Sequence, residues 1–248
     1  MEIHMSPNLK IFSTPEELAR ELAFEFLAEL QKKYNAMEMM VVALSGGSTP
    51  ALLFRELALY SQRPDWGWLK IFWSDERMVP PDHPQSNYGL AKKILLDEVP
   101  IPPQNIFRMP GEIPVEEAAE KYAALIRQEV PAAENGIPQF DWIFLGLGED
   151  GHTASLFPDE ESLQTTDKIC LAATHPGSGQ SRLTFTLPLI NQARKIVFLV
   201  TGSSKSKVVA DILKQRPSVS SYPAALVQPL KGELVWYLDK TAASNLKQ

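Results

Sequence analysis

The chain has 248 residues, of which 44% are hydrophobic and 22% are charged, a composition typical of a globular protein with a buried core. Its formal net charge is -6, and no basic block interrupts the spread of acidic residues, which argues against a nucleic-acid partner. The N-terminus lacks a basic region followed by an apolar core, and no run of roughly eighteen apolar residues occurs, so neither export nor membrane insertion is indicated. We expect one domain over residues 1–248, monomeric and cytoplasmic.

The only cysteine, Cys170, lies in an apolar run at residues 169–173. A single cysteine cannot form a disulfide within the chain, so we expect it to pack as a small hydrophobic side chain. This usage is typical of a protein kept in a reducing compartment.

The predicted strands and helices alternate along the chain. Thr14, Pro15 and Glu17 form a capping box with proline at the first helical position, and apolar residues then recur at helical spacing, which predicts a helix over residues 15–33. The same reasoning predicts strands at 39–44, 71–74, 142–147 and 195–200, and helices ending near 60 and covering 87–96, 115–128 and 204–213. This alternation favours a Rossmann-like α/β fold, with a doubly wound, mostly parallel sheet flanked by helices.

Three further segments also read as strands, at residues 169–173, 183–186 and 233–238. The last has polar ends around a short aromatic centre, so we expect it at an edge of the sheet.

The first candidate site is a glycine-containing loop between a predicted strand and a predicted helix. It consists of Ser45, Gly46, Gly47, Ser48 and Thr49. Backbone N–H groups, two hydroxyls and the helix dipole can converge on a phosphate in such a loop. A plain turn with Thr49 as the helix N-cap is an equally good interpretation, because the loop lacks the lysine and the spacing of a nucleotide P-loop.

A second loop, at residues 201–205, also follows an apolar strand and precedes a helix. It brings Lys205 to a place where a cation can close on a bound phosphate. A lysine in the first helical turn opposes the macrodipole, so the placement favours a nearby anion, although a solvated surface lysine is the commoner outcome.

Charged residues also end the strand predicted at residues 71–74. Asp75 and Arg77 follow it at the carboxyl end, where loops build α/β active sites. A surface ion pair is the competing interpretation, and the local sequence alone favours it.

Among the four histidines, His152 has the most distinctive surroundings. Glycines flank the segment that contains Asp150 and His152, and the carboxylate two residues away can orient the imidazole and stabilise its charged form. The alternative is a loop histidine that is satisfied by hydrogen bonds and has no chemical role.

Several familiar site patterns are missing from the sequence. There is no His-Glu-x-x-His, no cysteine pair and no closely spaced cluster of three His or Asp ligands, which argues against a protein-held catalytic metal. There is no Gly-x-Ser-x-Gly elbow, and Cys170 has no polar neighbours in sequence, which argues against covalent acyl catalysis. The remaining chemistry is histidine-assisted activation of water or proton transfer on a phosphorylated small molecule.

Five motifs in order give the chain a specific resemblance. They are LSGGSTP at 44–50, SDERMVP at 74–80, SNY at 86–88, GEDGHTASLFP at 148–158 and RLTFTLPLIN at 182–191. With them the chain resembles the 6-phosphogluconolactonase family over nearly its whole length. The resemblance implies hydrolysis of 6-phospho-D-glucono-1,5-lactone to 6-phosphogluconate in the oxidative pentose phosphate pathway, without a cofactor. It also implies the fold of glucosamine-6-phosphate deaminases and ribose-5-phosphate isomerases.

The resemblance also implies roles for individual residues. His152 resembles the general base that deprotonates the attacking water, and Asp150 resembles its orienting partner. The phosphate would be held by residues 46–49 together with Arg182 and Lys205, while Asp75 and Arg77 would line the sugar end. The loop N–H groups and Arg77 are both candidates for the donors to the oxyanion.

Two other functions compete with lactone hydrolysis. The deaminase branch shares the Asp-Gly-His motif, but the position at which that branch carries a glutamate that assists its histidine is Phe157 in this chain. The second is a sugar-phosphate-sensing domain that has lost the activity. Regulators of this kind usually also carry a DNA-binding module, for which the chain has neither spare length nor a basic patch. One local departure from the family is the segment at 175–181, which lacks the proline-rich pattern that we expect there.

Overall fold

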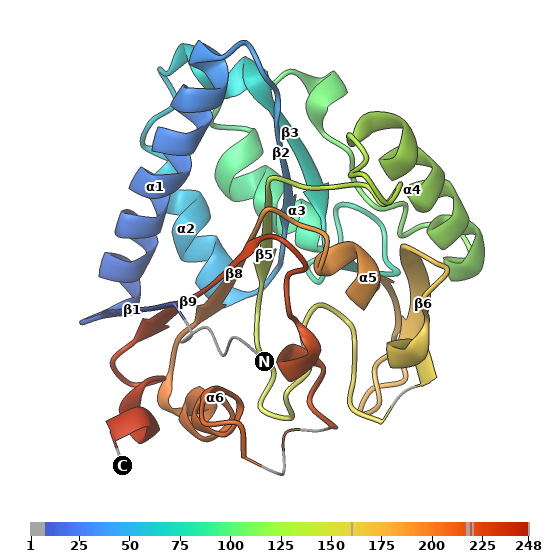
Figure 1. Ribbon diagram of the computed structural model, residues 1–248. Helices are drawn as coiled ribbons and strands as arrows, with labels where there is room; N and C mark the ends of the chain where they lie inside the picture. Colours follow the sequence, from blue (N-terminus) through green and yellow to red (C-terminus); the bar gives the residue numbers. More distant parts are fainter. Residues whose placement is uncertain (1–7, 160, 217–218, 220, 248) are drawn as a thin grey trace.

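The computed structural model describes residues 8–159, 161–216, 219 and 221–247, and these form two sheets (Figure 1). The larger sheet has the order β1-β9-β8-β5-β2-β3, and every neighbouring pair in it is parallel. Its strands are β1 (Asn8–Phe12), β2 (Met40–Leu44), β3 (Leu69–Trp73), β5 (Trp142–Leu145), β8 (Lys195–Val200) and β9 (Glu233–Asp239). The smaller sheet is antiparallel and contains β4 (Asp75–Arg77), β7 (Ser181–Phe185) and β6 (Cys170–Thr174).

Helices flank both sheets. The α-helices are α1 (Pro15–Asn35), α2 (Ser48–Ala58), α3 (Asn87–Ala91), α4 (Val115–Glu129), α5 (Leu187–Ile190) and α6 (Ser206–Leu213). Shorter turns are η1 (Pro64–Trp68), the π-helical η2 (Lys92–Leu96), η3 (Pro103–Asn105), η4 (Glu161–Gln164), η5 (Ser203–Lys205), η7 (Pro223–Leu226) and η8 (Ser244–Lys247). Figure 1 shows α1 and α2 side by side against the larger sheet, and α4 beside β6 at the other side of the molecule. The expected α/β class with a mostly parallel sheet is confirmed.

The long helix α1 forms where its capping residues predict it. The Thr14 hydroxyl accepts a hydrogen bond from the Glu17 N–H at 3.2 Å, and the Glu17 carboxylate reaches back to the Ser13 N–H at 2.7 Å. The apolar face of the helix is buried along its length, at Leu18, Leu22, Phe26 and Leu30. Burial of each such side chain contributes about 1.5–3 kcal/mol, so packing against the sheet rather than helix propensity holds α1 in place.

The expected edge position of the segment at 233–238 is wrong. Strand β9 lies between β8 and β1, and its last five residues are buried. Strand β1 covers it in parallel register, with Asn8 opposite Val235 and Phe12 opposite Asp239. A strand of five residues directly before the cap of α1 carries no separate local signal, so its pairing with a strand more than two hundred residues away follows from tertiary packing alone.

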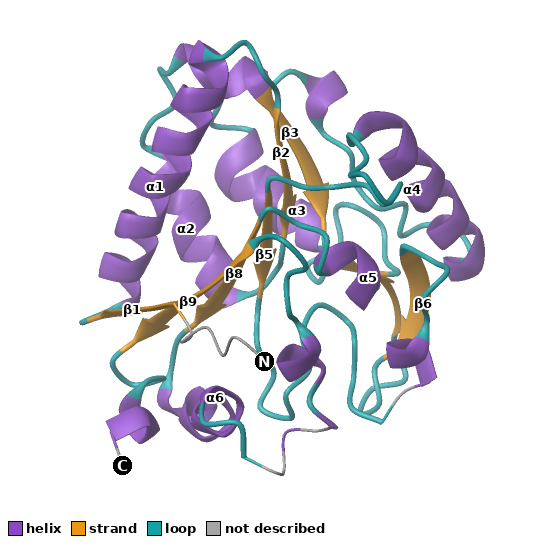
Figure 2. Cartoon of the chain, viewed as in Figure 1, coloured by secondary structure: helices purple, strands orange, loops and turns teal. Residues whose placement is uncertain are grey.

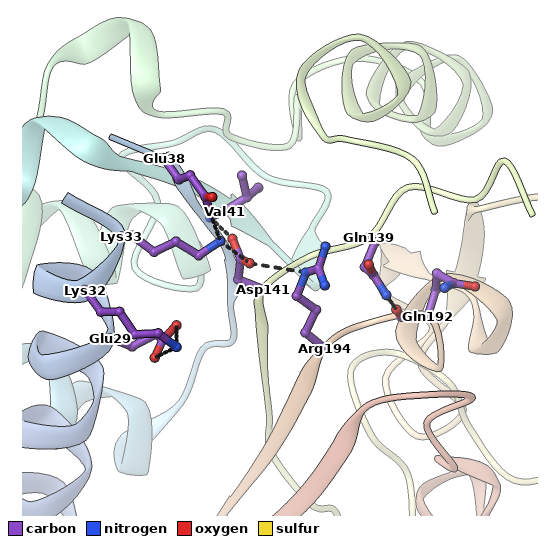
Figure 3. A network of polar contacts seen from close by, with 9 residues as sticks. All are labelled: Glu29, Lys32, Lys33, Glu38, Val41, Gln139, Asp141, Gln192 and Arg194. Carbon is purple, nitrogen blue, oxygen red and sulfur yellow. Dashed lines mark hydrogen bonds and ion pairs between the residues drawn. The ribbon is translucent and has the colours of Figure 1, made fainter. Parts of the chain in front are cut away.

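An ion-pair network fixes the start of β5 (Figure 3). The Asp141 carboxylate accepts a hydrogen bond from the Val41 N–H at 2.9 Å and lies 3.0 Å from Lys33 Nζ and 3.5 Å from Arg194 Nε. Burial alone would lower the pKa of Lys33, but Asp141, assisted by Glu38, outweighs burial and raises it. Each charged group in this network therefore has a partner of opposite charge.

The carboxyl ends of the parallel strands, at the other edge of the sheet from Asp141, carry the longest loops. Figure 2 shows these loops, in teal, gathered at the end of the sheet beside α6. Strand order changes direction between β2 and β5, because β2 connects onward to β3 on one side while β5 is followed by β8 on the other. Ligands of open α/β sheets bind outside the carboxyl ends of the strands at such a switch point. In the part of the chain that the structure describes, no helix is long and apolar enough to cross a membrane.

Candidate active site

A pocket of about 160 Å³ opens at the switch point between β2 and β5. It is lined by Ser45, Gly46, Asp75, Arg77, Asn87, Gly146, Leu147, His152, Ala154 and Arg182. These residues come from five segments that are far apart in sequence: the loops after β2 and β5, the strands β4 and β7, and α3. The carboxyl ends of β2, β3 and β5 bring most of them to one edge of the sheet. Six of the residues proposed from the sequence line this pocket, namely Ser45, Gly46, Asp75, Arg77, His152 and Arg182, and a seventh, Asp150, pairs with His152.

The histidine and aspartate of the β5 loop form a dyad. His152 Nδ1 lies 2.6 Å from Asp150 Oδ1, and the His152 backbone N–H donates to the same oxygen at 3.1 Å. A carboxylate accepts hydrogen bonds, so the contact places the proton of the neutral ring on Nδ1 and leaves the lone pair on Nε2. The alternative interpretation, a loop histidine satisfied by hydrogen bonds, holds for Nδ1 but not for Nε2, for which the described residues supply no partner.

Two neighbours restrict the plane of the imidazole. A Cβ atom on Gly148 would overlap both the His152 ring and the Asp150 carboxylate, so glycine is required there for the dyad to form. The buried ring of Phe157 packs against the imidazole at a tilt of 53°, with the ring centroids 5.1 Å apart. The ring of His175 contacts Phe157 in turn, at 5.2 Å and nearly edge-on.

The dyad also changes the chemistry of its carboxylate. Partial burial would raise the pKa of Asp150, but the His152 backbone N–H and imidazole outweigh burial and lower it. Asp150 is therefore ionised near neutral pH and can stabilise an imidazolium that forms during a reaction.

Asp75 lines the pocket, as its place at the carboxyl end of β3 suggested, and it is a buried hydrogen-bond acceptor, so the competing interpretation as part of a surface ion pair is wrong. It begins strand β4, has 5% of its surface exposed, and accepts from the Ser155 hydroxyl at 2.8 Å. The Asn87 amide nitrogen donates to its backbone carbonyl at 2.9 Å and contacts its carboxylate at 3.3 Å. The aspartate thereby ties the β5 loop to α3.

The next residue, Glu76, is a site-building residue that our sequence analysis missed. Its carboxylate accepts hydrogen bonds from Arg77 N–H, Asn87 N–H and Tyr88 N–H at 2.7–2.9 Å, and from the Ser86 hydroxyl at 3.0 Å. These contacts hold the start of α3 against β4. The Ser-Asn-Tyr motif was visible in the sequence, but its partner was not, because the two segments meet only in the folded chain.

Position 46 in the β2 loop requires a glycine because the Asn87 side chain lies against it. A Cβ atom on Gly46 would overlap the Asn87 amide, so a side chain at position 46 would force the two segments apart. The close approach narrows the pocket between the β2 loop and α3.

Arg77 and Arg182 lie directly opposite each other on the antiparallel strands β4 and β7. Both line the pocket, and in the described part of the chain neither buried Nε atom has a hydrogen-bond partner, although Arg77 Nη1 donates to the Gln85 carbonyl at 2.8 Å. Burial, and then the neighbouring Arg77, lower the pKa of Arg182. Two adjacent guanidinium groups without an anion repel each other, so this part of the pocket is suited to a bound anion.

The β2 loop is confirmed as a strand-to-helix turn, but Thr49 is not its cap. The helix begins at Ser48 after Gly47, which has a φ of 101° and provides no side-chain cap. Thr49 instead exchanges a hydrogen bond of 2.8 Å with the Thr201 hydroxyl, which joins this loop to the loop after β8. Ser45 and Gly46 line the pocket, while the first N–H groups of α2 remain uncapped by side chains.

Lys205 lies near the pocket without lining it. Its Nζ atom is 3.9 Å from the Glu149 carboxylate, and 24% of its side chain is exposed. It precedes α6, which begins at Ser206. Its contact with a substrate phosphate therefore stays a prediction.

Cys170 is buried in β6, where burial raises the pKa of the thiol. A thiol held protonated is a poor nucleophile. Within the residues that the structure describes, no three His, Cys, Asp or Glu side chains gather as they would around a metal ion.

The sequence model for the family described as glucosamine-6-phosphate isomerases/6-phosphogluconolactonase matches residues 13–236. The chain is 40% identical over 237 residues to a 6-phosphogluconolactonase of Haemophilus influenzae, covering 95% of this chain and 98% of the relative. It is also 40% identical to the human 6-phosphogluconolactonase, covering 96% and 93% of the two chains. The solved structure of 6-phosphogluconolactonase from Trypanosoma brucei superimposes with a TM-score of 0.86 at 29% identity, over 97% and 98% of the two chains.

Proposed function

Because the chain belongs to the glucosamine-6-phosphate isomerase/6-phosphogluconolactonase family, we propose that it hydrolyses 6-phospho-D-glucono-1,5-lactone to 6-phospho-D-gluconate in the oxidative pentose phosphate pathway. The Asp150–His152 dyad supports this function most directly, because His152 lines the pocket and its Nε2 atom has no hydrogen-bond partner among the described residues. A neutral imidazole with an acceptor nitrogen beside a pocket is the arrangement that general-base activation of water requires.

In the proposed reaction His152 Nε2 takes a proton from a water molecule as the water oxygen bonds to C1 of the lactone. The tetrahedral intermediate then collapses, the bond between C1 and the ring oxygen breaks, and the imidazolium returns the proton to that oxygen. Asp150 stabilises the imidazolium between these two steps. One histidine thus serves as base and then as acid, and no covalent enzyme intermediate forms.

We assign the substrate phosphate to the cationic side of the pocket. Arg182 lines that side, the N-terminus of α2 without a side-chain cap follows Gly46 and Gly47, and Lys205 ends the β8 loop, which the Thr49–Thr201 hydrogen bond joins to the β2 loop. A dianion beside Arg182 would offset the positive charge that this side chain and its neighbour Arg77 concentrate in the pocket. Binding energy at the phosphate would hold the reacting carbon near His152. Asp75 and Arg77 are assigned to the sugar end.

Phe157 favours the lactonase branch over the deaminase branch. Its buried ring packs against the imidazole and stands at the sequence position where the deaminase branch carries a glutamate. A phenyl ring neither ionises nor accepts a proton, so a ring-opening relay through this position cannot operate. Phe157 leaves His152 with one carboxylate partner, Asp150.

The test is a rate assay with freshly prepared 6-phosphogluconolactone, in which a dehydrogenase specific for 6-phosphogluconate reports the product. A parallel assay with glucosamine 6-phosphate measures ammonia. We expect lactone hydrolysis well above the spontaneous rate and no ammonia release. Ammonia release would instead support the deaminase branch, and binding of 6-phosphogluconate without acceleration would support a sensing role.

A further inference from the structure

The turn that carries the dyad is closed by its own backbone. The Gly148 N–H donates to the His152 carbonyl at 2.8 Å, and the Gly151 N–H donates to the Gly148 carbonyl at 3.2 Å. Gly151 has a φ of 84°, in the left-handed region that favours glycine. The relative positions of Asp150 and His152 therefore depend on how firmly this turn is held from outside.

A segment late in the chain packs on the outer side of the turn. A Cβ atom on Gly151 would overlap the ring of Tyr222, so the ring lies directly against the Gly151 backbone. Two residues later, the Ala224 N–H donates to the Gly151 carbonyl at 3.0 Å, and Ala224 is 1% exposed. Both contacts fall on the residue between the two members of the dyad.

The segment that presents Tyr222 is itself anchored elsewhere. The Asn191 side chain, at the end of α5, donates to the Leu226 carbonyl at 3.1 Å and accepts from the Gln228 N–H at 2.8 Å. Residues 223–226 form a short helical turn, η7. The ring of Tyr222 thus presses on the dyad turn from a braced support rather than from a free loop.

We propose that Tyr222 is a positioning residue for the Asp150–His152 dyad, acting through ring packing on Gly151. The inference deepens the proposed function and rests on it for its kinetic consequences. The hydroxyl of Tyr222 has no hydrogen-bond partner among the residues that the structure describes, so the flat ring and not the hydroxyl makes the contact. A misplacement of about 1 Å in a catalytic group can lower a rate by about 100-fold.

Two substitutions separate the effect of the Tyr222 ring on kcat from the effect of its hydroxyl. Tyr222→Ala removes the ring, and we expect kcat to fall by about 10- to 100-fold with KM within about threefold, because the dyad and not the phosphate side is displaced. Tyr222→Phe keeps the ring and is expected to keep kcat within about twofold. Tyr34→Ala is the matched control, since it removes a tyrosine that packs on Trp68 at the far end of α1.

A double-substitution cycle tests whether Tyr222 acts through the dyad. In an Asp150→Asn background the dyad is already impaired, so adding Tyr222→Ala is expected to lower kcat by less than about twofold. Full multiplication of the two losses would show that Tyr222 affects the rate by another route and would overturn the proposal. So would a Tyr222→Ala variant that retains kcat. If that variant does not fold, Tyr222→Leu, which keeps apolar bulk without a flat ring, is expected to lower kcat by at least about fivefold.

A readout without substrate distinguishes failure of this inference from failure of the proposed function. The His152 Nδ1 proton, identified by its loss in His152→Ala, is expected as a downfield proton NMR signal in the wild type and in Tyr222→Phe. In Tyr222→Ala we expect the signal to broaden or vanish through exchange with water. An unchanged signal in that variant would contradict the positioning role, whatever reaction the pocket supports.

Discussion

The two ends of strand β5 carry two aspartates with opposite surroundings. At the amino end, Asp141 is buried and meets Lys33, Arg194 and a backbone N–H. At the carboxyl end, Asp150 is half exposed and accepts hydrogen bonds from the backbone N–H and ring of His152, whose Nε2 atom has no hydrogen-bond partner among the described residues. The first arrangement satisfies every charge, whereas the second leaves an acceptor available for chemistry.

The arginines show the same contrast. Arg194 at the amino end lies 3.5 Å from a carboxylate, while Arg77 and Arg182 at the carboxyl end lie on opposite strands and, among the residues that the structure describes, their Nε atoms have no hydrogen-bond partner. Unsatisfied and like-charged groups cost stability in the free protein, so they persist where a ligand completes them. Substitutions at the amino end should therefore affect stability, and those at the carboxyl end should affect activity.

The largest expected effect is that of His152→Ala. Loss of a general base lowers kcat by about 10²- to 10⁴-fold, while the melting temperature should fall by only a few degrees, because the side chain lies on a loop and is 31% exposed, although its ring packs against Phe157. Initial rates above the spontaneous hydrolysis and a thermal melt measure both quantities. Retention of most of kcat would remove His152 from the mechanism.

The next effect concerns the arginine pair. Arg182→Met keeps the aliphatic stem and removes the charge, so KM for the phosphorylated lactone should rise by about 10- to 100-fold, as expected for a lost hydrogen bond to a charged group. Relief of the repulsion with Arg77 should leave the melting temperature unchanged or higher. KM for unphosphorylated gluconolactone should change little.

Arg194→Met is the matched control for this substitution, because it removes a guanidinium at the other end of the sheet. Its KM should equal that of the wild type. Equal effects of Arg182→Met on the phosphorylated and unphosphorylated lactones would argue against a phosphate contact.

A smaller effect is expected at the amino end. Lys33→Met leaves the Asp141 carboxylate with one fewer charged partner, so the free energy of unfolding should fall by about 1–2 kcal/mol while kcat stays within about twofold. Urea denaturation and initial rates test both statements. A change in kcat without a change in stability would contradict the assignment of the amino end of the sheet to stability.

The pH dependence of that stability difference has a defined sign. The pKa of Lys33 is raised above its ordinary value of 10.5, so its contribution is fully present below that pH and is lost as the pH rises through the higher folded-state value. The stability difference between wild type and Lys33→Met should therefore be constant from neutral pH to about pH 10 and shrink above it. A difference that shrinks toward acid instead would contradict the stated cause.

The sequence predicted those elements whose formation depends on local residues alone. The cap at Thr14 and the buried runs of β2 and β5 needed no partner to be recognised. Strands β1 and β4, with five and three residues, were missed because their pairing with β9 and β7 is decided by distant parts of the chain. Strand β9 was wrongly expected at an edge, because the strand that covers it, β1, was itself missed.

The site divides in the same way. Asp150 and His152 are two residues apart, and their contact follows from one loop, so the sequence alone was enough to find them. Glu76 and Asn87 were not found, because their roles depend on contacts between β4 and α3. The opposition of Arg77 and Arg182 follows from strand register between segments about a hundred residues apart, which no local pattern records.

The most direct test compares Asp141→Asn with Asp150→Asn, the same substitution at the two ends of β5, with kcat and melting temperature measured for each. Asp150→Asn should lower kcat by at least about 10-fold and leave the melting temperature nearly unchanged, because it removes the charge that orients and stabilises the imidazole. Asp141→Asn should lower the melting temperature by several degrees, at roughly 2–4 °C per kcal/mol, and leave kcat within about twofold. If both variants lost activity and stability together, or if Asp150→Asn kept full activity, the division of the molecule into a stabilising end and a catalytic end would be wrong.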